Sequence, residues 1–165
     1  MSVKRKYSRE ETLTRMRAWC DYQERSHIEV VRKLRSWGWY GEELDAFVAA
    51  LVSDNYLNEE RFARAYASGK FRIKGWGRIR IIQGLKQHRV SNYSLRAAME
   101  EIEPEEYRQT LLKHIERKSG QYYHEDDWNL RARLHRFLTS KGFEPDEFTV
   151  DVERFVAGRK SDNER

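Results

Sequence analysis

The chain is poor in residues that stiffen or cross-link a backbone, with one cysteine and two prolines among 165 residues. The single thiol, Cys20, excludes an internal disulfide, and its place in a helical stretch predicts a small buried side chain. Nine glycines accompany the two prolines while 36% of the residues are charged, which favours helices joined by short turns over an all-β fold. No apolar run reaches the length of a membrane span, so we expect no membrane contact.

The chain also lacks the residue patterns of a catalytic or metal centre. Its five histidines, at positions 27, 88, 114, 124 and 135, are not paired with cysteines or carboxylates at metal-ligand spacing. No Ser/His/Asp set is present either, so we expect a protein that is not an enzyme and that uses no cofactor and no metal. The basic residues 1–6 precede no apolar segment and so do not form a signal peptide. Together with the lone cysteine, this predicts a cytoplasmic protein.

Acidic residues are missing from one long stretch. Between Arg61 and Arg96 there are ten Lys or Arg and no Asp or Glu, whereas the flanking segments nearly balance. The net charge of +5 therefore comes from the middle of the chain. Because the same stretch carries apolar residues at helical spacing, it predicts a folded face of one charge, which most often binds a polyanion or an acidic protein surface. A solvated face without a partner is the other interpretation.

What the sequence does contain is an internal repeat. Segments that begin near Leu34, Leu85 and Leu138 align without a gap, at offsets of 51 and 53 residues. Each comprises the end of one helix, a turn and a second helix, and a further helix precedes each pair. The apolar positions that align in the second helices are Leu44, Leu95 and Phe148, then Val48, Met99 and Val152, then Leu51, Ile102 and Phe155.

This pattern predicts an all-α fold, a tandem array of three three-helix repeats in an elongated, curved arrangement. Each unit is similar in outline to helix-turn-helix DNA readers, although most three-helix units do not read bases. The predicted repeats are 8–57, the basic repeat 58–103, and 104–157, and a polar C-terminal tail follows at 158–165.

The turns of the repeats predict where helices end. Gly38 and Gly142 can adopt the left-handed conformation that closes a helix. The second repeat has Arg89 at this position, which should cost stability or force a different turn. In the same repeat, Asn58 is expected to cap the helix from Glu59 to about Ile73.

Helical spacing also predicts the inward faces of the middle repeat. In its first helix the expected apolar stripe consists of Phe62, Ala65, Tyr66 and Gly69. In the helix from Arg78 to His88 the side chains expected inward are Ile79, Ile82 and Leu85.

The loop Gly75-Trp76-Gly77 lies between these two helices. One interpretation is a flexible bend that lets the backbone and nearby cations approach a phosphate or a carboxylate. The other is a tight connection in which Trp76 fills a gap between repeats. It is not a nucleotide-binding loop, because no strand precedes it and no Gly-Lys-Ser/Thr follows.

The middle of the chain resembles a known family. The resemblance rests on the segment Tyr56–Tyr66 (YLNEERFARAY), Lys70, the segment Lys74–Ile81 (KGWGRIRI) and the pair Leu85-Lys86. This pattern is similar to the RecX family of bacterial recombination regulators, most clearly over residues 30–95. The family tends to have a glycine where Arg89 stands, which puts the turn of the second repeat in doubt.

The resemblance implies an inhibitor of the RecA recombinase, with a place in DNA recombination, DNA repair and the SOS response. RecX-like proteins are thought to lie in the groove of the RecA–single-stranded DNA filament, and to reduce its ATP hydrolysis and strand exchange. Some also bind DNA directly. The implied partners are therefore the RecA filament and single-stranded DNA, with duplex DNA a further candidate, and we expect a monomer.

We expect the cations of the middle repeat to supply the contact with the filament. Reversing Lys74 and Arg78 to Glu should then weaken inhibition without unfolding the protein. The predicted contact residues are Arg61, Arg64, Lys70, Arg72, Lys74, Arg78, Arg80, Lys86 and Arg89, around the loop Gly75, Trp76 and Gly77.

Two other functions stay open at this stage. A helix-turn-helix protein that acts on duplex DNA without RecA would bind DNA sequence-selectively. A scaffold whose basic face meets an acidic protein would bind RecA but have no measurable affinity for naked DNA at moderate salt.

Overall fold

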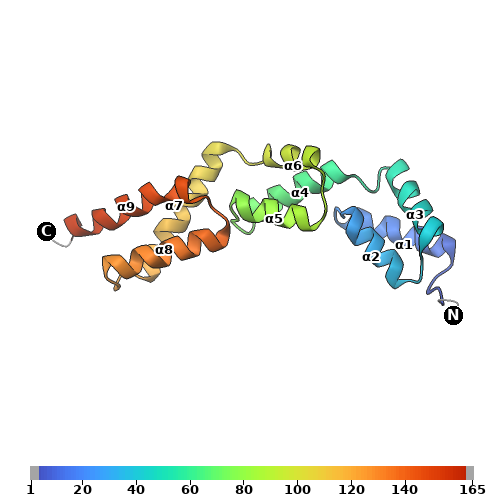
Figure 1. Ribbon diagram of the computed structural model, residues 1–165, viewed down its shortest axis with the longest axis horizontal. Coiled ribbons are helices and arrows are strands. Elements are labelled where there is room, and N and C mark those ends of the chain that lie inside the picture. The colour runs from blue at the N-terminus through green and yellow to red at the C-terminus, as the bar shows by residue number, and fades with distance from the viewer. Residues whose placement is uncertain (1–3, 163–165) are drawn as a thin grey trace. The chain divides into compact units, whose positions relative to one another are not determined.

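The computed structural model describes residues 4–162, which are helical throughout apart from short turns (Figure 1). Within this range the fold is all-α, a tandem array of three-helix repeats, as the sequence predicts. The helices are α1 (Arg9–Tyr22), α2 (His27–Ser36), α3 (Gly41–Ser53), α4 (Glu59–Arg72), α5 (Arg78–Gln87), α6 (Asn92–Met99), α7 (Pro104–Gln121), α8 (Asp127–Lys141) and α9 (Pro145–Asp162).

By packing, the chain divides into two compact units. The first comprises Met1–Tyr66 and Leu85–Ala98, and the second comprises Ala67–Gly84 and Met99–Arg165. Both α4 and α5 thus contribute residues to both units. The repeat boundaries and the elongated, curved arrangement stay predictions.

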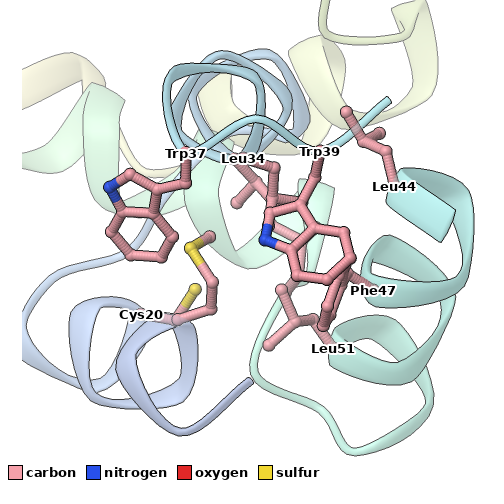
Figure 2. Close-up of a cluster of buried hydrophobic side chains, with 10 residues drawn as sticks. Cys20, Leu34, Trp37, Trp39, Leu44, Phe47 and Leu51 are labelled. Carbon is pink, nitrogen blue, oxygen red and sulfur yellow. The ribbon is translucent and has the colours of Figure 1, made fainter. Parts of the chain in front are cut away.

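The core of the first unit is a cluster of aromatic and aliphatic side chains from α1, α2, α3 and the segments that join them (Figure 2). The rings of Trp39 and Phe47 meet edge to face, with centroids 4.7 Å apart. Because a buried indole N–H needs an acceptor, Trp39 Nε1 donates to the hydroxyl of the buried Thr12 at 3.0 Å. Cys20 is buried in this cluster, as expected, and is a free thiol.

The core of the second unit is built mainly by α7, α8 and α9, which pack against one another. Leu111, Leu130 and Leu134 are fully buried, and Phe143 and Phe148 follow from the α8–α9 turn and α9. Full burial of each such side chain contributes about 2 kcal/mol, so several rings can support a small core in a polar chain.

The turn of each repeat closes its helix in the same way. Gly38, Arg89 and Gly142 all have positive φ, at 88°, 55° and 93°. In each turn the following amide donates back to the aligned leucine, with N–O distances of 3.1, 3.3 and 3.1 Å. Arg89 therefore does not force a different turn. It adopts the left-handed conformation that Gly38 and Gly142 adopt in the other turns, and this conformation is strained for a residue with a side chain.

Polar side chains cap several of the described helices, and Asn58 caps α4 as predicted. The side chain of Asn58 accepts a hydrogen bond from the amide of Arg61 at 2.9 Å. Asp126 caps α8 by accepting from the amide of Asn129 at 2.8 Å. Ser26, at the start of α2, forms a capping box with Glu29.

The inward faces of α4 and α5 differ from the prediction. In α4, Ala65 is exposed, while Ala63, Ala67 and Phe71 are buried. In α5, Ile79 is 39% exposed and Ile81 is fully buried. Both helices carry small or apolar residues on several sides, so spacing alone does not fix the rotation about the helix axis.

The last helix runs into the segment that the sequence predicts to be a polar tail. Helix α9 continues to Asp162, so residues 158–162 of the predicted polar tail extend the last helix. The remaining residues of that tail, 163–165, lie outside the described residues.

Candidate functional site

The loop between α4 and α5 is held tightly within the second unit. The amide of Gly77 donates to the carbonyl of Lys141 at 2.8 Å, and the amide of Ile79 donates to the carbonyl of Gly142 at 3.0 Å. A β-carbon on Gly77 would lie 2.3 Å from the Gly142 carbonyl oxygen, so only glycine lets the two backbones approach this closely. This geometry is that of a tight connection rather than of a flexible bend.

His114 of α7 holds the other side of the loop. Its Nε2 lies 2.8 Å from the carbonyl oxygen of Gly75 and donates to it, since a carbonyl only accepts. Burial lowers the pKa of His114; the bond to Gly75 raises it, and the charges of Lys141 and Arg117 lower it further. The net shift is downward, so the imidazole is neutral at pH 7 and acts as a fixed donor.

Trp76 orients two of the predicted contact residues. Its ring lies 4.8 Å from the Nζ of Lys70 and 4.0 Å from the guanidinium carbon of Arg80. Arg80 also donates to the carbonyl of Ser140 at 3.2 Å. Cation–π contacts of this kind hold long basic side chains near a fixed ring without neutralising their charge.

Two other predicted contact residues are bound by acidic side chains. Arg78 lies 3.8 Å over the ring of Tyr107 and 3.5 Å from a carboxylate oxygen of Glu144. The hydroxyl of Tyr107 donates to the same carboxylate. Burial is the main reason that the pKa of Tyr107 is raised. Arg72 pairs with Glu106 at 3.2 Å. A charge reversal at Arg78 would place a carboxylate beside Glu144, so Arg78 is a poor choice for a test that must leave the fold intact.

Four of the nine predicted cations belong to the first unit, namely Arg61, Arg64, Lys86 and Arg89. Arg61 pairs with Glu24 at 2.5 Å and also donates to the carbonyl of Asn55 at 2.9 Å. These contacts fasten the start of α4 to the preceding turns, which is a structural role. The predicted contact residues are thus divided between the two units, and their role as one contact surface stays a prediction.

The structure instead assembles a basic cavity in the second unit, of about 520 Å³. We call it the Lys74 cavity. Among the described residues that line it there is no acidic side chain. Its basic and imidazole-bearing residues are Arg72, Lys74, Lys113, His114, Arg117 and Lys141.

The cations of the cavity that the sequence did not predict are Lys113, Arg117 and Lys141. Lys113 and Arg117 are one helical turn apart on α7, and Lys141 immediately precedes the glycine of the α8–α9 turn. Because Lys113 and Arg117 are four residues apart in a predicted helix, the sequence could have shown that they share one face. Their connection to the loop at Lys74 arises only from tertiary packing.

The cavity is crowded with positive charge. Burial lowers the pKa of Lys141, and the neighbouring charges of Arg80, Arg117, Lys118 and Lys74 lower it further. Each of these effects disfavours the protonated amine, so an anion in the cavity would offset part of the repulsion.

No group of three or more His, Cys, Asp or Glu within residues 4–159, whose side chains the structure describes, is placed to hold a metal ion. Among the described helices, none has both the length and the apolar character that crossing a membrane requires.

Comparison with known proteins gives consistent matches along the chain. Residues 58–99 match the sequence profile described as "RecX, second three-helix domain", and residues 105–148 match "RecX, third three-helix domain". Curated relatives named "Regulatory protein RecX" include that of Pasteurella multocida, 28% identical over 76% of each chain. The relative from Herminiimonas arsenicoxydans is 31% identical over 73% of this chain and 77% of its own length.

Solved structures agree with the fold. The crystal structure of RecX from Lactobacillus salivarius is 17% identical, with a TM-score of 0.77 over 90% of this chain and 96% of that chain. A second crystal structure, of "regulatory protein RecX", is 19% identical, with a TM-score of 0.77 over 86% and 71% of the two chains. Given the matching domains, the relatives and the shared fold, this chain belongs to the RecX family of regulatory proteins.

Proposed function

We propose that the protein regulates the RecA recombinase by binding the RecA–single-stranded DNA filament and reducing its ATP hydrolysis and strand exchange. Membership of the RecX family supports RecA as the target. The resemblance of the middle repeat, described above, supports a filament rather than free RecA as the form that is bound.

The observation that carries the proposal is the Lys74 cavity. It gathers five Lys or Arg side chains without an acidic residue among the described lining. Ile73, at the same rim, is 80% exposed. A filament offers both partners that such a surface needs, phosphates for the cations and protein for the apolar side chain.

Electrostatics predict how this contact depends on salt. Each phosphate of a single strand that a cation neutralises adds about 0.7 to the slope of log affinity against log salt concentration. If three to five cavity cations engage the filament, affinity should fall with a slope of roughly 2 to 3.5. A contact dominated by the exposed isoleucine would have a much smaller slope.

The test is ATP hydrolysis by the cognate RecA on single-stranded DNA, with the protein added below one copy per RecA. The informative variant is Lys74→Glu with Lys113→Glu. Both side chains are exposed, and neither forms an ion pair with a residue between positions 4 and 159. The matched control is Arg136→Glu with Arg154→Glu, which makes the same charge change at exposed sites on α8 and α9.

We expect the unmodified protein and the control variant to inhibit ATP hydrolysis at substoichiometric amounts. The cavity variant should require about tenfold more protein for the same inhibition. Equal inhibition by both variants would refute the assignment of the Lys74 cavity. No inhibition by the unmodified protein at equimolar amounts would refute the function itself. Sequence-selective binding of duplex DNA would then indicate a helix-turn-helix DNA-binding protein. Binding to RecA without affinity for DNA would indicate a scaffold.

A further inference from the structure

A second basic cavity lies in the first unit, between α2 and the α5–α6 turn, with a volume of about 410 Å³. We call it the Arg89 cavity. Arg32 and Arg35 line it from α2, and Arg89 lines it from the turn. All three side chains are exposed, and none forms an ion pair with a residue between positions 4 and 159. Three guanidinium groups therefore face one hollow from two directions.

The turn that carries Arg89 is fixed in place. The neighbouring ring of His88 lies 5.0 Å from that of Phe62 and 5.5 Å from that of Tyr66, between centroids. His88 Nδ1 is also 2.8 Å from the hydroxyl of Ser26, a buried residue that caps α2. These contacts tie the turn to the start of α2, so Arg89 is held near Arg32 and Arg35 rather than free to swing away.

Arg89 occupies a position where its backbone conformation is unfavourable. Its φ is 55°, in the left-handed region, whereas the equivalent turns have Gly38 and Gly142. The turns share the same hydrogen bonds, so glycine would close this one equally well. A strained residue where an unstrained one would fold better points to a role for its side chain.

A buried polar atom at the cavity also lacks a partner. The Nδ1 atom of His27, which lines the cavity, is buried and forms no hydrogen bond within the described chain. Buried ring nitrogens are ordinarily satisfied, so this unpaired nitrogen sets the lining of the cavity apart from ordinary packing.

We propose that the Arg89 cavity binds a backbone phosphate of a nucleic acid strand. A phosphate is tetrahedral and can accept hydrogen bonds from guanidinium groups that approach from different sides, whereas a planar carboxylate suits a single fork. The one acid in the lining, Glu59, already accepts from the amide and hydroxyl of Ser91, so it does not pair with the arginines. This site is separate from the Lys74 cavity, and it does not require RecA.

Two substitutions at Arg89 separate its charge from its backbone strain. Arg89→Gln removes the charge but keeps a side chain in the left-handed conformation. Arg89→Gly removes the charge and relieves the strain. We expect both to weaken binding of a fluorescein-labelled octathymidylate strand and to lower the salt slope by about 0.7. Only Arg89→Gly should raise the midpoint of thermal unfolding, by about 2 °C.

The control is Arg154→Gln, which removes an exposed charge from α9 and should leave the salt slope unchanged. An unchanged slope in Arg89→Gln would overturn the phosphate contact, and a lower midpoint in Arg89→Gly would overturn the argument from strain. Competition by polyglutamate as effective as by the unlabelled strand would assign the cavity to an acidic protein instead. Because the assay contains no RecA, a failure here is distinct from a failure of the proposed regulation.

Discussion

Replacing Gly77 by alanine tests whether the α4–α5 loop is as tightly packed as the structure indicates. The added β-carbon would lie 2.3 Å from the Gly142 carbonyl oxygen and 2.4 Å from the Phe143 nitrogen, where ordinary contacts begin at 3.4 Å. Backbone atoms cannot turn aside, so the two segments must separate by about 1 Å. That movement would lengthen the bonds that Gly77 and Ile79 donate, now 2.8 and 3.0 Å, beyond useful range.

The magnitude follows from these two losses. Overpacking costs about 1 to 3 kcal/mol, and each lost hydrogen bond about 1 kcal/mol. We expect Gly77→Ala to lower the free energy of unfolding by about 3 to 5 kcal/mol, measured by urea titration with far-ultraviolet circular dichroism. The matched control is Gly69→Ala in α4, where the new β-carbon meets nothing within 4 Å. This change should stabilise the protein by about 0.5 to 1 kcal/mol, since alanine favours the helix.

One result of these two substitutions would contradict the tight packing of the α4–α5 loop. A loss below about 1 kcal/mol in Gly77→Ala would mean that the loop can relax at little cost. The loop would then be a flexible bend, and the fixed geometry of the Lys74 cavity would lose its basis. Destabilisation by Gly69→Ala would instead show that the α4 surface is occupied in a way that the structure does not record.

Three further predictions concern a buried thiol, a hydrogen-bonded carboxylate and an ion pair with a buried carboxylate. Burial raises the pKa of Cys20 to about 11, so alkylation by iodoacetamide at pH 8 should be roughly 100-fold slower in the native protein than in urea. Burial raises the pKa of Glu59, but hydrogen bonds from Ser91 and Ser94 and the charge of His27 together lower it more, so the net shift is downward. This lowered pKa stabilises the fold above about pH 4.5 and the benefit is lost as pH falls; Ser91→Ala should thus cost about 1 kcal/mol at pH 7 and less in acid. Arg108→Leu would leave the buried carboxylate of Asp151 unpaired and should cost about 2 kcal/mol in urea unfolding.

The sequence was sufficient to predict the helical fold and the alignment of the repeats. Leu34, Leu85 and Leu138 align in the sequence, and all three are fully buried. The turns that follow them share one hydrogen-bonding pattern, including the turn that has Arg89. Short-range chemistry, namely helical periodicity and a left-handed closing residue, determines these features, and it can be read from a single chain.

Rotation of helices and the assembly of the cavity could not be predicted in the same way. Ile79 and Ile81 are both apolar, and only the packing of α5 decides that Ile81 is buried. The Lys74 cavity draws Lys113 and Lys141 from segments whose overall charge nearly balances. A charge count along the chain averages such residues with their acidic neighbours, whereas the fold separates them in space.

If the Lys74 cavity binds the target as proposed, the crowding of cations around Lys141 links the lifetime of the protein to that target. Like charges held together lower the stability of the unbound fold, and an anion that enters the Lys74 cavity binds only the folded form. The bound protein is thus the more stable one, and copies without a partner unfold more often and are the first to be exposed to proteases. The amount of protein that persists in a cell would then follow the amount of target to which it can bind, without any change in synthesis.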